Sequence, residues 1–279
     1  MKLVFENKKG KVIMNEGSVD GFNILSAEGL DPVQKLYTTV EYIGKFGQQT
    51  INVHSKSRVI TLSGDVLIKG RRELENAIKV FSDDVWLTVD KGVKKRKIYT
   101  KIKRFEIFNK NSKYLGFALQ LEADNPYFTD VEKIKDNLYI RENLVTGQMD
   151  LPCVFTKRSI GKNVVNKGIV KAYPQIILYD TASNGKIEEK KRFTIVNERI
   201  PLSVSFDCET ETGEIITIDF DRRTAISNIK GDITVDLAQE NYLSDFCLEE
   251  GDNFITVINE TGREITAVCE HYNNYGECI

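Results

Sequence analysis

The segment from Arg58 to Phe81, RVITLSGDVLIKGRRELENAIKVF, changes its hydrophobic period within a few residues, and this change strongly constrains the fold. Its first part keeps apolar residues on one parity, which predicts one face of a pleated strand or of a tight hairpin bent at Ser63–Asp65. These residues are Ile60, Leu62, Val66 and Ile68. Its second part repeats apolar residues at i, i+3, i+4 and i+7, which predicts a helix over residues 71–81 that docks on a sheet. These residues are Leu74, Ala77, Ile78 and Phe81.

The rest of the chain consists mainly of short apolar runs separated by turn signals, a pattern typical of antiparallel sandwiches and barrels. In the first half, clean alternation resumes after residues 109–112, which predicts a hairpin, and a slip of parity predicts a bulge near Lys103–Arg104. In the second half, Asn184–Gly185, Glu211–Gly213 and Glu260–Arg263 are each predicted to close a hairpin. Further strands are expected near residues 151–155, 233–237 and 246–248, giving a sandwich of eight or nine strands.

The run Asp124-Asn125-Pro126 interrupts the strand pattern, because proline restricts the residue before it. A chain of 279 residues also agrees with two domains of ordinary size. The sequence therefore predicts a mainly β protein with two antiparallel β-sandwich domains. The first covers residues 1–128 and carries the helix, and the second covers residues 129–279.

Composition excludes several classes of function. With 39 Lys and Arg against 41 Asp and Glu, the balanced charge argues against a protein built mainly to bind nucleic acid or membrane surfaces. The start has no apolar run that suits a signal peptide, and no later segment is long enough to span a bilayer, so we expect a soluble, initially cytoplasmic product. Five cysteines without a CxxC pair indicate free thiols, and two histidines leave little material for acid-base catalysis.

Two groups of residues suggest chemistry but have simpler explanations. Cys269, His271 and Cys278 are soft metal ligands, yet they lack the paired spacing of a zinc site. Asp219 and Asp221 flank Phe220 and resemble a glycosidase pair or a hard-metal site, but the polar face of a strand explains this spacing equally well. We therefore expect no catalytic, cofactor-binding or metal-binding residues.

One segment is strongly basic, with Tyr99 and Phe105 within it, and could contact nucleic-acid phosphates. The balanced overall charge favours instead a solvated strand, or a strand that meets acidic residues of another subunit. Trp86, the single tryptophan, is more typical of a core or a subunit contact than of a ligand site. The candidate subunit-interface residues are therefore Trp86, Lys94, Lys95, Arg96, Lys97, Lys101 and Lys103.

Four short motifs, taken in order, resemble the distal tail (Dit-like) proteins of long-tailed bacteriophages and of phage-derived tail-like particles. They are Gly29-Leu30-Asp31-Pro32, Arg58-Val59-Ile60-Thr61-Leu62 with the helix after it, Asn125-Pro126-Tyr127-Phe128, and Leu248-Glu249-Glu250-Gly251-Asp252-Asn253. Each motif is weakly specific alone, and the resemblance rests on their order and spacing over most of the chain.

The resemblance implies a tail-tube-like first domain, six copies of which form a ring that joins the tail tube to the tip. It implies a galectin-like or carbohydrate-module-like second domain that docks receptor-binding or baseplate proteins. The implied partners are further copies of the chain, the tail-tube protein, the tail-associated tip protein and those docked proteins. DNA would pass through the channel without being bound, and no membrane partner or cofactor is implied. The expected location is the tail tip of a virion or tail-like particle, after assembly in the bacterial cytoplasm, and some relatives return their last residues to the first domain.

Two other functions remain open at this level. A carbohydrate-binding adhesion module that recognises host cell-wall glycan is suggested by the tyrosines of the second half, although tyrosines also serve cores and interfaces. These are Tyr173, Tyr179, Tyr242, Tyr272 and Tyr275. A carboxylate-dependent hydrolase rests on Asp219 and Asp221 alone.

Overall fold

The structure is a computed structural model that describes the chain except residues 19–20, 43–45, 68–70, 110–112, 143–161, 183–189, 201, 239–241, 261–263 and 279. The chain divides into two compact units. The first unit contains Met1–Val131 together with Tyr275–Ile279, and the second contains Glu132–Asn274. The second unit is therefore an insertion in the chain of the first.

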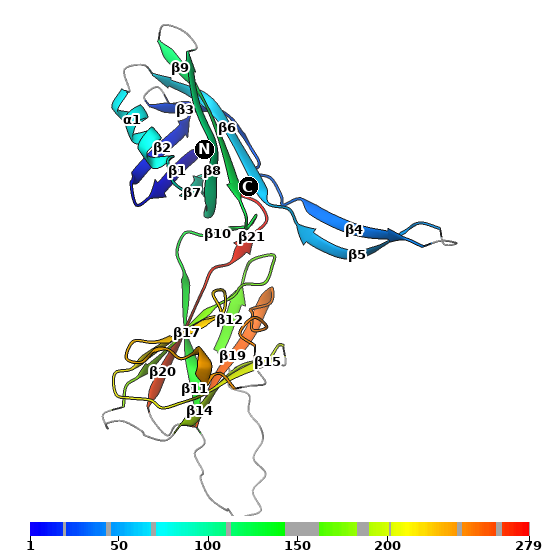
Figure 1. Cartoon of the computed structure of the whole chain (residues 1–279), viewed down its shortest axis with the longest axis vertical. Coiled ribbons are helices and arrows are strands. Elements are labelled where there is room, and N and C mark those ends of the chain that lie inside the picture. Colours follow the sequence, from blue (N-terminus) through cyan, green and yellow to red (C-terminus); the bar gives the residue numbers. More distant parts are fainter. Residues whose placement is uncertain are drawn as a thin grey trace, which may run out of the picture. The chain divides into compact units, whose positions relative to one another are not determined.

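The first unit is built on a closed barrel of seven strands, shown with its other elements in Figure 1. In sheet order the strands are β8 (Lys95–Asn109), β7 (Val85–Asp90), β1 (Lys2–Asn7), β2 (Gly10–Glu16), β3 (Phe22–Glu28), β6 (Arg58–Leu67) and β9 (Tyr114–Ala123). The ring closes because β8 pairs with β9 as well as with β7. The sequence predicted a sandwich here, and the difference arises because alternation shows which face of a strand is buried but not which strands pair.

The segment that opened the sequence analysis forms one long strand and a helix. Strand β6 continues through Gly64 without a turn, because its residues pair with β9 along the full length from Arg58 to Leu67. The helix α1 (Arg71–Val80) follows, as predicted, and contacts β1 and β2. Its buried residues are Ala77 and Val80, with Phe81 just beyond its end, whereas Ile78 is 52% exposed. The sequence analysis placed Ile78 among the apolar residues of the docking face. This prediction is wrong, because the face that the helix buries against the barrel is too narrow to include Ile78.

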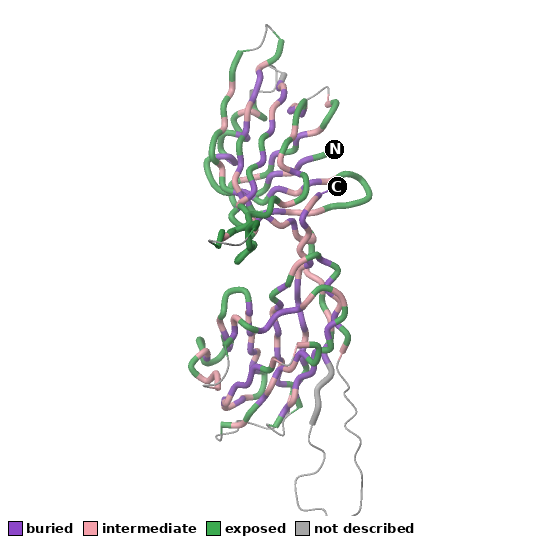
Figure 2. The backbone as a smooth tube through the Cα atoms, turned by 90° about the vertical axis from the view of Figure 1, so that its right-hand side faces the viewer, coloured by how far each residue is buried: buried purple, intermediate pink, exposed green. Residues whose placement is uncertain are grey.

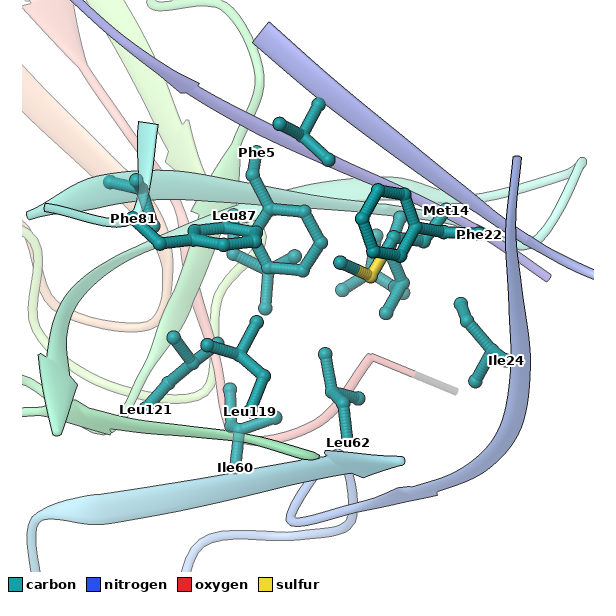
Figure 3. Packing of buried hydrophobic residues seen from close by; sticks show 14 of the residues in the cluster. Phe5, Met14, Phe22, Ile24, Ile60, Leu62, Phe81, Leu87, Leu119 and Leu121 are labelled. Carbon is teal, nitrogen blue, oxygen red and sulfur yellow. The ribbon is translucent and has the colours of Figure 1, made fainter. Parts of the chain in front are cut away.

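The barrel interior is filled by apolar side chains from every wall strand (Figure 3). Phe5 meets Phe81 edge to face at 5.2 Å between ring centroids, and Phe22 meets Phe117 in the same way at 5.3 Å. Edge-to-face contact is a favourable arrangement for aromatic rings because positive edges face negative ring faces. The alternation predicted for Ile60, Leu62 and Val66 is confirmed, since all three are buried, while Ile68 lies outside the described residues.

The predicted hairpin of the first half is also confirmed. Strands β8 and β9 pair antiparallel from Lys101 opposite Glu122 to Asn109 opposite Leu115. Their register shifts between Ile102 and Arg104, where the slip of parity predicted a bulge. The bulge adds one residue to β8 and bends it, which assists closure of the barrel.

A second sheet of the first unit is a two-stranded ribbon, β4 (Lys35–Glu41) and β5 (Gln48–Ser55). Within the described part of the chain these strands pair only with each other, and Figure 1 shows them as a hairpin separate from the barrel sheet. Most of their residues are exposed, including Tyr37 at 62% and Ile51 at 58%. We call β4 and β5 the ribbon.

The second unit contains two ladders of strands that share β11 (Ile134–Glu142). One ladder runs β15 (Leu202–Cys208), β14 (Lys191–Asn197), β19 (Gly251–Asn259), with β12 (Lys162–Asn166) also paired to β19. The other runs β20 (Ile265–His271), β13 (Gln175–Asp180), β16 (Ile215–Asp219), β17 (Thr224–Ser227), β18 (Gly231–Asp232). Strand β11 pairs antiparallel with β20 in its first half and parallel with β19 in its second half.

The three hairpins predicted for the second half are wrong. In each case the two flanking strands, β13 and β14, β15 and β16, or β19 and β20, pair in different ladders among the described residues. The turn residues Asn184–Gly185 and residues 261–263 themselves lie outside the described residues. The strands predicted near 233–237 and 246–248 are also wrong, since Thr234–Asp236 is a short 3-10 helix and Leu248 makes one isolated bridge with Ala172. The strand predicted near 151–155 lies outside the described residues.

Both ladders bury one common hydrophobic cluster. Figure 2 colours the buried residues along the strands of the second unit purple. Phe193 and Phe206 of one ladder stack at 5.2 Å, and Phe220, which follows β16, stacks on Phe246 at 4.4 Å. A turn between two strands that face each other across a core needs the same local residues as a hairpin turn. Of the three predicted turns only Glu211–Gly213 lies in the described residues, and the chain there connects β15 of one ladder to β16 of the other.

The reactivity of the buried cysteines tests whether the two units pack and unfold as described. Cys208, Cys247, Cys269 and Cys278 are free and buried, and burial raises the pKa of Cys208 to about 12. Since the thiolate is the reactive form, we expect a thiol reagent at neutral pH to leave these four unlabelled in the native protein. As urea is added, peptide mapping by mass spectrometry should show Cys278 labelled with unfolding of the first unit and Cys208 with unfolding of the second. Rapid labelling of Cys278 without urea would contradict the packing described.

Candidate interaction surfaces

The predicted basic segment lies on β8, where most of its cations meet acidic groups of the same chain. Lys95 lies 3.1 Å from Asp90, Lys101 lies 2.5 Å from Asp124, and Lys103 lies 2.5 Å from Glu122. The hydrogen bond from Lys103 lowers the pKa of Glu122, and the bond to Asp124 raises the pKa of Lys101. These pairs neutralise the strand locally, which weakens the case for a phosphate-binding surface.

The other candidate residues have different surroundings. Arg96 stacks on the ring of Tyr275 with its Cζ atom 3.8 Å from the ring centroid, and its guanidinium donates to the carbonyl of Glu277. Lys97 donates to the carbonyl of Val131 at 2.8 Å. Lys94 lies in the turn before β8, where its carbonyl accepts from the backbone N–H of Lys91.

Trp86 lines a partly aromatic groove of about 200 Å³ on the outer face of the barrel. The Trp86 and Tyr99 rings meet edge to face at 5.2 Å, and the Lys97 ammonium lies 5.0 Å from the Trp86 ring centroid. We call this the Trp86 groove, and its principal lining residues are Trp86, Tyr99, Tyr127, Lys101, Glu122 and Asp124. The structure therefore brings together three of the seven candidate residues, Trp86, Lys97 and Lys101.

Arg58 is a buried arginine of β6 that joins three other segments of the first unit. Its guanidinium donates to the carbonyls of Gly29 at 2.6 Å, Asp31 at 2.7 Å, Pro126 at 2.7 Å and Gly276 at 2.5 Å. Burial lowers the pKa of Arg58, a desolvation cost that these carbonyl acceptors offset. Three of the four motifs that carried the family resemblance therefore meet at one side chain.

Gly29 shows how closely these segments approach. It has a φ of +84°, and a Cβ atom added there would lie 2.0 Å from the carbonyl oxygen of Val59. Only glycine fits this backbone without displacement of β6. The backbone of the first motif is thus shaped to present its carbonyls to Arg58.

The C-terminal segment, Tyr275–Cys278, completes the first unit. Tyr275 donates to Asp130 at 3.1 Å, and the backbone N–H of Cys278 donates to the carbonyl of Leu30 at 3.2 Å. Strand β21 (Asn274–Tyr275) pairs with β10 (Phe128–Asp130), which in turn pairs with β8. The last described residues thus return to the first unit, as the family resemblance implied.

The two chemical alternatives find little structural support. Among the described residues no group of three possible metal ligands occurs, and Cys278 belongs to the first unit whereas Cys269 and His271 belong to the second. One Asp219 carboxylate oxygen accepts the backbone N–H groups of Asp221 and Arg222 at 3.1 and 2.9 Å, which fixes the turn after β16. The spacing of these acidic residues is explained by this turn.

The tyrosines of the second half do not share one environment. Tyr173 and Tyr242 are exposed, Tyr179 and Tyr272 are half-buried, and Tyr275 packs under Arg96 in the first unit. Tyr275 therefore belongs to the first unit, whereas the other four tyrosines belong to the second.

Sequence reasoning missed both Arg58 and the ribbon. A signal for Arg58 was present, because Arg58 has the same parity as Ile60 and Leu62 and so points to the buried face. A charged residue on the buried face needs partners, and here they are carbonyls that local patterns do not reveal. The two strands of the ribbon contain apolar residues between polar ones, as partly buried strands do. The sequence therefore did not show that most of the ribbon is exposed to solvent.

Comparison with known proteins supports the resemblance at the level of the fold. No protein-family model matches the chain, and no curated protein matches it in sequence. The structure is similar to the SPP1 Dit (gp 19.1) protein, described as a paradigm of hub adsorption apparatus in phages that infect Gram-positive bacteria, with a TM-score of 0.63 and 11% identity. That match covers 91% of this chain and 93% of the other.

Chains of the phage P2 baseplate in its activated conformation are also similar. The form with Ca gives a TM-score of 0.55 at 9% identity, over 99% of this chain and 99% of that chain. The form with Sr gives 0.52 at 9% identity, over 96% of this chain and 97% of that chain. The chain therefore has a Dit-like fold along nearly its whole length. No helix in the described residues has the length and apolar character needed to cross a membrane.

Proposed function

We propose that this protein is a structural component of a phage or phage-like tail tip, where copies of it form a ring hub between the tail tube and the tip. The observation that carries the proposal is the similarity to the SPP1 Dit hub protein over 91% of the chain. Asp219 fixes a turn and the four described cysteines are buried, so these groups have structural roles. This favours a function in which the protein binds other proteins through its surface. The first unit would form the ring, and the second, which we propose to be a galectin-like sandwich, would dock receptor-binding or baseplate proteins.

The ribbon is the feature best suited to join one copy to the next. Its strands expose Leu36, Tyr37, Ile51 and Val53 to solvent in the single chain. Apolar side chains concentrated on an extended element are typical of an interaction site. A contact between the ribbon and a different surface of a neighbouring copy is head-to-tail, and such contacts close into rings when the rotation permits.

Changing the ribbon should therefore prevent assembly without unfolding the chain. For the Tyr37→Lys, Val53→Lys double variant we expect association weaker by on the order of 100-fold, because two charges would be buried without partners. Light scattering and native mass spectrometry of the purified protein, alone and with the tail-tube protein, would measure the mass. The wild-type chain should form rings, with six copies expected from the resemblance.

Val235→Lys is the matched control, since Val235 is 89% exposed in the second unit and lies outside the ribbon. This variant should assemble as the wild type does. A wild-type chain that stays monomeric under all these conditions and binds no tail-tube protein would refute the proposed function.

A further inference from the structure

The C-terminal segment, Tyr275–Cys278, supplies the first unit with contacts that Met1–Val131 cannot make alone. Two of its carbonyls accept from Arg58 and Arg96. The Cys278 side chain is buried and belongs to the hydrophobic cluster of the barrel. The first unit is therefore complete only when this segment has returned to it.

The C-terminal segment also fixes the chain that leads into the ribbon. The backbone N–H of Cys278 donates to the carbonyl of Leu30 at 3.2 Å. Arg58, which binds the segment, donates to the carbonyls of Gly29 and Asp31 at 2.6 and 2.7 Å. Strand β4 of the ribbon begins four residues after Asp31. Release of the C-terminal segment would thus loosen the base of the ribbon.

The residues just before the C-terminal segment are fixed in the second unit. The side-chain carbonyl of Asn273 accepts from the backbone N–H of Lys167 at 2.8 Å. The backbone carbonyl of Asn274 accepts from the N–H of Ile169 at 2.9 Å, and its side-chain amide donates to the carbonyl of Lys171 at 3.1 Å. These three partners follow β12 directly in the chain. Folding of the second unit therefore fixes the point from which the C-terminal segment starts.

The chain that enters the second unit is held beside the chain that leaves it. Strands β11 and β20 pair antiparallel, with Lys135 directly opposite Glu270. The Lys133 and Lys135 ammonium groups lie 3.2 and 2.6 Å from the Glu270 carboxylate, which is largely buried. The folded second unit thus keeps the two ends of its own chain together.

Unfolding of the second unit would separate these ends. Residues 132–274 would then be a flexible loop, and the probability that the ends of such a loop meet falls with about the 3/2 power of its length. For a loop of this length the factor is on the order of 1,000. The folded second unit removes this cost, because it already holds both ends. Folding of the second unit therefore favours the return of the C-terminal segment to the first.

We infer that the C-terminal segment couples the two units, so that the barrel and the base of the ribbon are completed only in a chain whose second unit has folded. A chain with an unfolded second unit would have a less stable barrel and a loosened ribbon. The second unit thus acts as a regulatory element for the first. This inference goes beyond the proposed hub function, since the coupling occurs within one chain and needs no second copy.

A cross-link between the two ends of the second unit tests the coupling. Lys135→Cys and Glu270→Cys change residues that lie directly opposite each other, at a Cα separation that a disulfide can span. Phe193→Ala, which removes a fully buried side chain from the core of the second unit, is added so that this unit unfolds first. Labelling of Cys208 would show the urea concentration at which it unfolds. The disulfide would then still hold the two ends together.

The control for the disulfide carries Lys135→Ser and Glu270→Ser with the same Phe193→Ala change. The disulfide shortens the loop that must close from residues 132–274 to about ten residues. In urea that unfolds the second unit, the folded-to-unfolded ratio of the first unit should therefore be roughly 50-fold higher with the disulfide than in the control. Trp86 fluorescence measures this ratio. Equal ratios in the two variants would overturn the inference.

Phe254→Ala is the matched control for the core substitution, because Phe254 is 45% exposed on β19 of the same unit. It should leave the unfolding of both units as in the wild type. If Phe193→Ala aggregates, Ile195→Val is a milder core change in the same strand. All these measurements are made at concentrations too low for assembly. A wild type that never assembles would therefore refute the proposed function, while the coupling would be judged by the disulfide alone.

Discussion

Replacing Arg58 with Met is expected to destabilise the first unit by about 3–5 kcal/mol, because it leaves several backbone carbonyls without a donor, at a cost of roughly 1–3 kcal/mol for each one that stays buried. The Arg58 guanidinium satisfies four backbone carbonyls, and methionine satisfies none of them. Methionine keeps the apolar stem, so the loss reports mainly on the hydrogen bonds. Buried carbonyls left without donors cost more than the bonds themselves contribute.

Urea unfolding followed by Trp86 fluorescence measures this change in the first unit specifically, because the only tryptophan lies there. Arg104→Met is the matched control. Arg104 has a 64% exposed side chain and pairs with Glu106 on the surface of the same barrel, so its loss should cost less than about 1 kcal/mol. Equal effects of the two substitutions would show that the Arg58 contacts do not stabilise the native state.

Removal of the C-terminal segment, by ending the chain at Asn274, is expected to destabilise the first unit by about 4 kcal/mol. The truncation removes two carbonyls that accept from Arg58 and Arg96, and the buried Cys278 side chain. Charge-assisted hydrogen bonds contribute roughly 1.5–3 kcal/mol each, and burial of a side chain of this size about 1 kcal/mol more. The Trp86 transition should move to lower urea, and a transition that stays in place would contradict the role given to the segment.

Two comparisons sharpen this prediction. Glu277→Ala keeps the carbonyl that accepts from Arg96, so it should change stability by less than about 0.5 kcal/mol. Arg58→Met combined with the truncation should cost less than the sum of the two changes, since both remove the bond from Arg58 to Gly276. Strict additivity would mean that this bond is not formed in solution.

Features encoded within a short stretch of chain could be predicted from the sequence. The helix after β6 and the β8–β9 hairpin with its bulge depend on neighbouring residues and on parity, so local patterns were sufficient. The position of Ile78 was predicted wrongly, because the width of a buried helix face depends on the surface that it meets. That surface is assembled from β1 and β2, which lie far away in the chain.

Strand pairing could not be predicted in the same way. Closure of the barrel depends on β8 pairing with β9 as well as β7, and the chain through Glu211–Gly213 connects β15 and β16, which pair in different ladders. Apolar and polar residues alternate in the same way along two strands that pair in one sheet and along two strands that face each other across a core. The candidate interface was predicted in part, since Trp86, Lys97 and Lys101 lie at one groove, whereas its acidic residues, Glu122 and Asp124, lie at the end of β9 and just after it.

The pairing of β10 with β21 has a consequence for how this architecture can vary. The chain leaves the first unit just after Phe128–Asp130 and returns at Asn274–Tyr275, and these two strands are neighbours in one sheet. Paired strands are about 4.8 Å apart, so the two attachment points of the insertion are nearly adjacent. Any compact module whose own termini are close together could be exchanged for residues 132–274 without altering the barrel. The barrel can thus stay constant while the inserted module diversifies.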